Sequence, residues 1–221
     1  MKKEIRSGQS KLLIEQREYA DDVAVLFLPG MSGGALGERF RGVADMVAEL
    51  GHTSVRMSAW EGEAEVNTKT LRYLYAEIES ATNYLLENDF EEIMMIGKSF
   101  GGALVLAYEH PHVTKKIMWA PAIGIAAEQN ISLLLDTPLK EVSHLLDIHM
   151  SFEDVRTDNA RLYIIHGTDD IVVPLENSKK IIEASENGLL EIMEGAGHSF
   201  KTPEQESELL LITKKLLQEV R

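Results

Sequence analysis

The stretch EEIMMIGKSFGGALVLAYEH, residues 91–110, places a serine at the junction between two different residue patterns. Residues 91–97 are a short apolar run typical of a buried β-strand, and residues 100–109 have the small and apolar residues of a tightly packed helix. Ser99 lies between them, with a glycine two positions away on each side. Because glycine has no Cβ, this spacing predicts a strand, a sharp turn that carries Ser99, and a helix.

Strand-like and helix-like segments alternate through most of the chain. Residues 23–29 are a continuous apolar run, as expected for a strand buried on both faces. Residues 4–16 precede it and read as two short strands joined by a turn. Further strands are expected at 52–57, 91–97, 115–120, 161–167 and 189–194, and helices at 38–50, 66–88, 100–109 and 203–220. The alternation predicts an α/β fold with a mainly parallel central sheet and helices on both faces.

The chain has 221 residues, which suits a single domain covering residues 1–221. Residues 121–160 interrupt the alternation and have a helical pattern around 131–148. They predict either a small cap over a site or one ordinary crossover helix with long loops.

Charge and composition narrow the classes of partner. The chain has 22 Lys and Arg residues against 36 Asp and Glu residues, a formal net charge of −14. Such a surface repels phosphate backbones and anionic lipid headgroups, so we expect neither nucleic acid nor a membrane surface as a partner. There is no cysteine, no apolar run long enough for a signal peptide and none long enough for a membrane span. A cytoplasmic protein is therefore expected, and its oligomeric state stays open.

A serine hydroxyl becomes a strong nucleophile only when a base takes its proton. His198 is the best candidate among seven histidines, because it lies in the small-residue loop GAGHSF between the last expected strand and the last helix. A base of this kind needs a carboxylate to orient it. The segment after the strand 161–167 offers Asp169 and Asp170, of which we choose Asp170 because it lies nearer the apolar run that would anchor the loop. His166, at the end of that strand, is expected to make a structural hydrogen bond to the neighbouring loop.

Four motifs together resemble the α/β-hydrolase family, over a region from about residue 23 to the C-terminus. GKSFGG resembles the family's nucleophile elbow, HGTDDIVVP its acid loop, GAGHSF its histidine loop and LFLPGMSGG its oxyanion-hole loop. The resemblance implies an α/β-hydrolase fold and a triad of Ser99, Asp170 and His198. It also implies that the backbone N–H groups of Met31 and Phe100 form the oxyanion hole. Where the family commonly has His-Gly in the last motif, this chain has Pro-Gly, which affects loop geometry and substrate class.

The resemblance implies a carboxylesterase-like serine hydrolase that cleaves esters or thioesters and needs no cofactor and no metal. With at most a small cap, the pocket is expected to be open and to favour small soluble ester substrates. The same triad could instead cleave peptides, amides or C–C bonds, or transfer an acyl group to an acceptor other than water. A non-catalytic binding protein on the same fold is the alternative from another class. A metal enzyme built on His144 and His149 is disfavoured, because a spacing of five suits one helical face poorly.

Three further residues have open roles. Lys98, inside the elbow motif, either offers a cation to a substrate or is a solvated side chain. Trp60 and Trp119 follow expected strands at the edge that carries Ser99, and either could line a pocket. Core packing is the better interpretation for Trp119, and both interpretations remain open for Trp60.

Overall fold

The computed structural model describes residues 2–16, 20–122, 136–142 and 160–219. Its strands are β1 (Lys2–Ser7), β2 (Ser10–Glu15), β3 (Val23–Leu28), β4 (Thr53–Ser58), β5 (Glu92–Lys98), β6 (Val113–Trp119), β7 (Arg161–Gly167) and β8 (Gly188–Met193). Its helices are the 3₁₀ turn η1 (Glu38–Phe40), α1 (Arg41–Glu49), α2 (Glu63–Val66), α3 (Leu71–Leu86), α4 (Phe100–Ala107), α6 (Leu139–Val142), α8 (Leu175–Ala184) and α9 (Pro203–Gln218).

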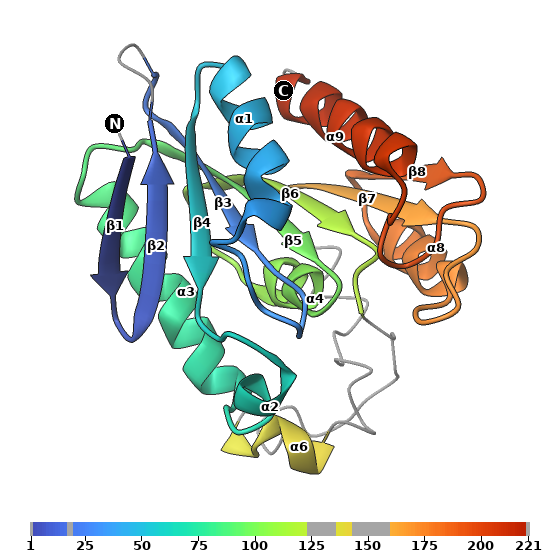
Figure 1. Cartoon of the computed structure of the whole chain (residues 1–221), viewed down its shortest axis with the longest axis horizontal. Coiled ribbons are helices and arrows are strands. Elements are labelled where there is room, and N and C mark those ends of the chain that lie inside the picture. The colour runs from blue at the N-terminus through green and yellow to red at the C-terminus, as the bar shows by residue number, and fades with distance from the viewer. Residues whose placement is uncertain (1, 17–19, 123–135, 143–159, 220–221) are drawn as a thin grey trace.

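The eight described strands form one twisted sheet in the order β1-β2-β4-β3-β5-β6-β7-β8 (Figure 1). The hairpin of β1 and β2 is antiparallel, and β2 also joins β4 in antiparallel orientation. All pairs from β4 to β8 are parallel. The mainly parallel α/β sheet predicted from the alternation of apolar runs is therefore confirmed.

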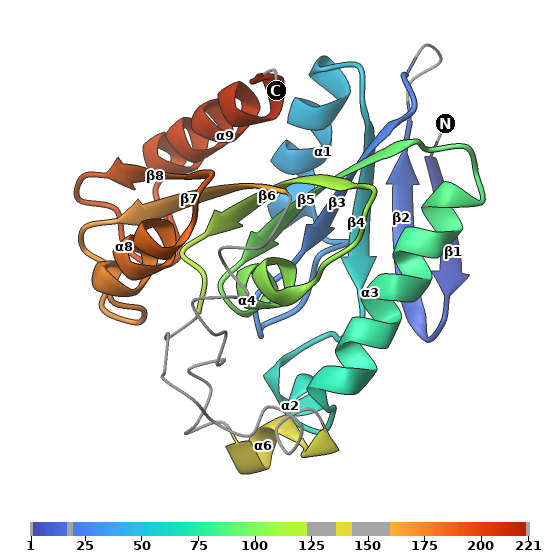
Figure 2. The same ribbon diagram turned by 180° about the vertical axis from the view of Figure 1, so that it is seen from behind.

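Helices cover both faces of the sheet. Helices α1 and α9 lie on one face, and α3, α4 and α8 lie on the other, as the two opposite views show (Figures 1 and 2). Each face has its own apolar core, because successive residues of a strand point to opposite sides. In β5, Met95 packs with the α3 and α4 side, whereas Ile96 packs with the α1 and α9 side. Both side chains are fully buried, as expected for a central parallel strand.

Two helix predictions need correction. The helix expected at 66–88 begins later, as α3, because Thr70 caps it by accepting the backbone N–H of Tyr73 with its side chain, and Val66 belongs to the separate short helix α2. Helix α8, which follows β7 in the chain and is labelled beside β7 and β8 in Figure 1, was not predicted. It begins directly after Pro174 and buries only Ser178 and Ile181, so it lacks the broad apolar stripe that identifies a helix in sequence.

The segment 121–160, predicted to be a cap or a crossover helix, lies largely outside the described residues. Within it the structure describes residues 121–122, helix α6 and Ala160. The helical pattern at 131–148 is described only from 136 to 142, and His144 and His149 lie outside the described part. Within the described ranges, we find no helix with the length and apolar character that crossing a membrane requires.

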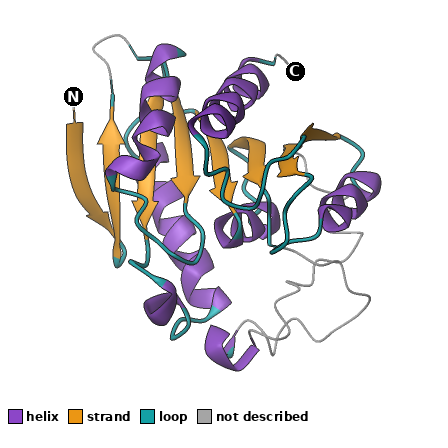
Figure 3. Cartoon of the chain, turned by 45° about the vertical axis from the view of Figure 1, so that its right-hand side comes forward, coloured by secondary structure: helices purple, strands orange, loops and turns teal. Residues whose placement is uncertain are grey.

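The parallel strands bring four loops to one edge of the sheet. Strands β3, β5, β7 and β8 run in the same direction, so their carboxyl ends lie at the same edge (Figure 3). The loops that follow them contain Met31, Ser99, Asp170 and His198 respectively. This edge is where open α/β sheets bind ligands.

Candidate active site

Ser99 has a strained backbone at the turn between β5 and α4. Its φ of 50° and ψ of −116° lie in a region that residues with a side chain rarely adopt. Three hydrogen bonds hold this conformation: the Ser99 N–H donates to the Trp119 carbonyl at 2.8 Å, and the Ser99 carbonyl accepts the N–H groups of Ala103 and Ala122, both at 3.0 Å. Such strain costs about 1–3 kcal/mol and persists only where the surroundings enforce it.

The flanking glycines are required by close backbone approach. A Cβ on Gly97 would lie 2.5 Å from the Gly101 carbonyl oxygen. A Cβ on Gly101 would lie 2.3 Å from the carbonyl oxygen of Pro29 and 2.6 Å from that of Leu28. These distances are below van der Waals contact, so the turn can pack against the end of β3 only with glycine at both positions.

The side chains of Ser99, His198 and Asp170 form a continuous hydrogen-bonded chain. The Nε2 atom of His198 lies 2.9 Å from the Oγ of Ser99, and its Nδ1 atom lies 2.8 Å from Oδ2 of Asp170. The Asp170 carboxylate is buried, and the His198 ring is about 15% exposed. The structure thus brings together the three side chains that the sequence predicted as a triad.

Asp170 is held as an anion. Its Oδ1 atom accepts the backbone N–H groups of Val172 and Val173, each at 2.8 Å. Burial raises the pKa of Asp170, but the N–H of Val173, the His198 ring and the N–H of Val172 together bring it below its ordinary value. The alternative acid, Asp169, is exposed, and its carboxylate accepts a hydrogen bond from the hydroxyl of Thr168. The geometry therefore favours Asp170 over Asp169 as the partner of His198.

The loop after β3 lies directly against Ser99. A Cβ on Gly30 would lie 3.4 Å from the Cβ of Ser99 and 3.6 Å from the Lys98 carbonyl oxygen, so Gly30 packs against the turn that carries Ser99. Among the described residues, neither the N–H of Met31 nor that of Phe100 has a hydrogen-bond partner. Two unpaired donors beside a serine hydroxyl are what an oxyanion hole requires.

Side chains that the sequence analysis did not assign hold this loop. The Trp60 indole N–H donates to the Gly30 carbonyl at 3.0 Å, and its ring packs edge-on against Phe100. Arg56, which is 1% exposed, donates to the carbonyl of Gly37 at 2.9 Å and to that of Ala35 at 3.3 Å. Trp60 is therefore a buried support of the loop. The contacts of Arg56 depend on tertiary packing and leave no signal in the sequence.

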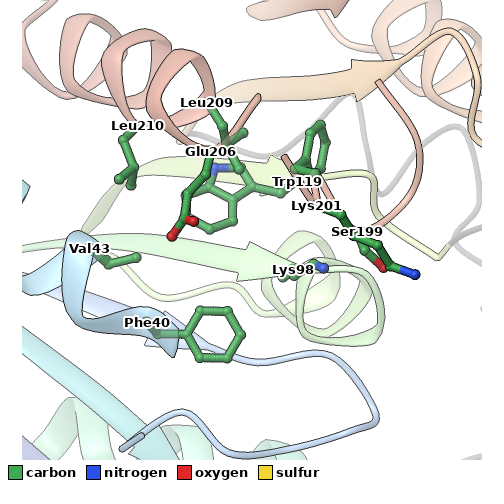
Figure 4. Close-up of a pocket in the computed structure, with 10 residues that line it drawn as sticks. Phe40, Val43, Lys98, Trp119, Ser199, Lys201, Glu206, Leu209 and Leu210 are labelled. Carbon is green, nitrogen blue, oxygen red and sulfur yellow. The ribbon is translucent and has the colours of Figure 1, made fainter. Parts of the chain in front are cut away.

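Lys98 is buried, so the interpretation as a solvated side chain is wrong. It is 7% exposed and borders a cavity of about 420 Å³ between α1, α9 and the loop after His198 (Figure 4). Trp119 lies in the wall of the same cavity and donates its indole N–H to Thr213 at 3.0 Å. Trp119 is also packed against Phe27, as expected for a core residue. The lining includes none of the three triad side chains, although Lys98 and Ser199 are chain neighbours of two of them.

His166 makes the structural hydrogen bond to the neighbouring loop that was expected. It is fully buried at the end of β7, and its Nε2 atom lies 3.1 Å from the Val173 carbonyl oxygen. Its Nδ1 atom lies 2.6 Å from the hydroxyl of Ser178 on α8, a contact that sequence analysis did not foresee. No cluster of three or more potential metal-ligating side chains occurs in the described part of the chain.

Comparisons with solved structures identify the fold. No family model matches the chain, and no curated protein matches its sequence. Est1E from Butyrivibrio proteoclasticus has a TM-score of 0.76 at 17% identity, over 98% of this chain and 97% of Est1E. The meta-cleavage product hydrolase CumD from Pseudomonas fluorescens IP01 has a TM-score of 0.74 at 17% identity, over 99% and 98% of the two chains. The mouse alpha/beta hydrolase domain-containing protein 10 has a TM-score of 0.71 at 14% identity, over 98% of each chain. The chain therefore has the α/β-hydrolase fold, as its motifs predicted.

Proposed function

We propose that this protein is a serine hydrolase that cleaves ester or thioester bonds of small soluble molecules through an acyl-enzyme on Ser99. The observation that carries the proposal is the hydrogen-bonded chain from Ser99 through His198 to Asp170 at the carboxyl edge of the sheet. A serine, an imidazole and a buried carboxylate in this order are the elements of triad catalysis on several unrelated folds.

The polarity of the hydrogen bonds follows from the charge of Asp170. Since its pKa is lowered, the carboxylate is ionised near neutral pH and can only accept. The Nδ1 atom of His198 therefore carries a hydrogen, and Nε2 keeps a lone pair directed at the Ser99 hydroxyl. In this tautomer His198 is ready to act as a general base.

In the first half of the reaction, the Ser99 Oγ attacks the carbonyl carbon while His198 Nε2 takes its proton. The tetrahedral oxyanion accepts hydrogen bonds from the N–H groups of Met31 and Phe100, each worth roughly 3–4 kcal/mol in the transition state. His198 then donates the proton to the leaving alcohol or thiol, and the C–O or C–S bond breaks. In the second half, His198 deprotonates a water molecule, which attacks the acyl carbon. His198 then returns this proton to Ser99 Oγ as the bond between Oγ and the acyl carbon breaks and the acid leaves.

A fluorophosphonate probe tests the nucleophile, with intact mass as the readout on the wild type and on Ser99→Ala, His198→Ala and Ser199→Ala. We expect one adduct on the wild type, none on Ser99→Ala and slow labelling of His198→Ala. Ser199→Ala is the matched control, because it removes a neighbouring serine hydroxyl and should label like the wild type. A folded wild type that takes no adduct would contradict the proposal and favour a ligand-binding protein on the same fold.

The substrate class is tested separately with p-nitrophenyl esters of increasing acyl length. We expect kcat/KM to fall as the acyl chain lengthens, since the proposed substrates are small. Est1E has been solved with ferulic acid bound, so small aromatic acids and their esters belong in the same panel. Equal turnover of short and long chains would contradict the preference for small esters. Labelling of Ser99 without ester turnover would instead favour amide or C–C cleavage, or acyl transfer.

A further inference from the structure

A second buried histidine contacts the carboxylate of Asp170. The Nε2 atom of His166 lies 3.2 Å from Oδ2 of Asp170, the same oxygen that accepts the hydrogen bond from His198. The side chains of His166 and Asp170 are both fully buried. The mechanism described above does not use His166, so its place beside the acid needs an explanation.

The hydrogen-bond partners of His166 define its tautomer. Its Nε2 atom faces the carbonyl oxygen of Val173 and the carboxylate of Asp170, and neither oxygen can donate. Nε2 must therefore carry the hydrogen. This N–H group donates to the Val173 carbonyl, and its partial positive charge lies close to the Asp170 carboxylate. Burial lowers the pKa of His166 more than these acceptors raise it, so the ring is neutral at neutral pH.

Ser178 stabilises that tautomer from the other side of the ring. In neutral His166 the Nδ1 atom has a lone pair, and the Ser178 hydroxyl at 2.6 Å must donate to it. Ser178 is fully buried on α8, whose axis is set by its packing on β7 and β8. The contacts thus run from α8 through Ser178 and His166 to the loop that carries Asp170.

We propose that His166 and Ser178 are positioning residues that hold the Asp170 carboxylate in the orientation in which it accepts the Nδ1–H of His198. This inference rests on the proposed function of the triad. Two backbone N–H groups fix Oδ1 of Asp170, and the Nε2–H of His166 faces Oδ2, so the carboxylate has little freedom to rotate. Displacing a catalytic group by about 1 Å can reduce the rate about a hundredfold, so this restraint has a direct consequence for catalysis.

Two substitutions separate positioning from simple packing. A glutamine at position 166 can place its amide nitrogen where Nε2 lies and keep the donor that faces Asp170. An asparagine reaches only to the position of Nδ1, so it can accept from Ser178 but leaves Asp170 without that donor. We expect His166→Gln to keep kcat and the labelling rate within about threefold of wild type, and His166→Asn to lower both by roughly 10–100-fold with little change in KM.

A double-mutant cycle tests Ser178. Ser178→Ala should lower the labelling rate several-fold in the wild type, because the His166 ring loses its hydrogen bond at Nδ1 and is held less firmly beside Asp170. It should have no further effect in His166→Gln, which has already lost the acceptor for the hydroxyl. All rates are measured well below each variant's melting temperature, so that loss of stability alone does not change them.

The low-field proton resonance of the His198 Nδ1–H gives a readout that does not depend on turnover. We expect it to be retained in His166→Gln and lost in His166→Asn. Equal rates in the two folded variants, with the resonance unchanged in both, would overturn the proposal and leave His166 a packing residue. If the wild type neither labels nor hydrolyses esters, the proposed function fails, and the resonance alone decides whether His166 positions Asp170.

Discussion

At the scale of single residues, the Asp170 carboxylate makes the stability of the protein depend on pH. Its folded-state pKa lies below the ordinary value of about 3.9, so its interactions stabilise the protein above that pH. As the pH falls through the folded-state pKa, the carboxyl takes up a proton and this contribution is lost. We therefore expect Asp170→Asn to be less stable than the wild type at neutral pH, with a difference that shrinks below about pH 4.

Urea unfolding followed by tryptophan fluorescence across this pH range measures the difference. Asp169→Asn is the control, because it removes one negative charge from an exposed neighbour and so corrects for the change in net charge. A difference that stayed constant down to pH 3 would show that the ionised form of Asp170 does not stabilise the fold.

The turn at Ser99 makes a second prediction at this scale. A methyl group on Gly101 would push against the carbonyl oxygens of Leu28 and Pro29, so Gly101→Ala must separate α4 from the end of β3. We expect a loss of stability of about 1–3 kcal/mol, as for other overpacked sites, and a strong loss of labelling by fluorophosphonate. Gly62→Ala is the matched control, since a Cβ there has open space and its φ of 177° suits any residue. Equal behaviour of the two variants would show that the turn tolerates a wider separation.

At the scale of elements, two adjacent lysines of β6 bind the ends of helices on opposite faces of the sheet. The Lys116 ammonium donates to the Leu106 carbonyl near the end of α4 at 3.1 Å. The Lys115 ammonium donates to the carbonyls of Leu217 and Glu219 at the end of α9, both at 2.6 Å. A cation at a helix C-terminus is favoured by the unpaired carbonyls and by the helix dipole. These contacts explain how two consecutive lysines can be buried in a central strand.

Lys116→Met should therefore lower the stability of the protein and leave its reactivity at Ser99 unchanged. It removes a fully buried cation and leaves the Leu106 carbonyl without this donor, for an expected loss of about 1–3 kcal/mol in the free energy of unfolding. The labelling rate should stay close to that of wild type, because Ser99 lies at the opposite end of α4. Chemical denaturation and fluorophosphonate labelling of the same preparation measure both. A large loss of labelling at unchanged stability would contradict this assignment.

The same scale shows what the sequence could predict. The strand 161–167 was predicted with its observed bounds, and the strands from β3 to β8 within two residues, because most of them are rich in apolar residues and all lie between turn or helix segments. Helix α8 could not be predicted because it buries only Ser178 and Ile181 and so has no apolar stripe in the sequence. The positions of the proposed triad, Ser99, Asp170 and His198, followed from motifs on the loops after β5, β7 and β8. The contacts of His166 with Ser178 and Asp170 could not be predicted, because they depend on how α8 packs against β7.

At the scale of the whole molecule, the acidic surface opposes folding. A net charge of −14 in a chain of this size makes the compact state repel itself. Ion pairs offset this only slightly. Lys214 with Glu49 and Arg72 with Asp136 are partly or largely exposed, and such pairs contribute about 0–1 kcal/mol each. The Arg56–Glu15 pair is largely buried, so dissolved salt screens it weakly.

Added salt should consequently stabilise this protein. Between about 0.01 M and about 0.15 M salt the Debye length falls from about 30 Å to about 8 Å, which screens the long-range repulsion more than the short contacts. If screening removed about 1 kcal/mol of this repulsion, the melting temperature would rise by about 2–4 °C for a chain of this length.

The matched variant is Glu208→Lys, an exposed position inside α9 where the two residues have similar helix propensity. It brings the net charge to −12 by replacing a negative charge with a positive one. Its melting temperature should exceed that of wild type at low salt and approach it at 0.15 M, roughly where the Debye length is about 8 Å. A melting temperature that falls with salt in both proteins would mean that attractive pairs dominate the surface. The distribution of charge, rather than its sum, would then control the stability of this fold.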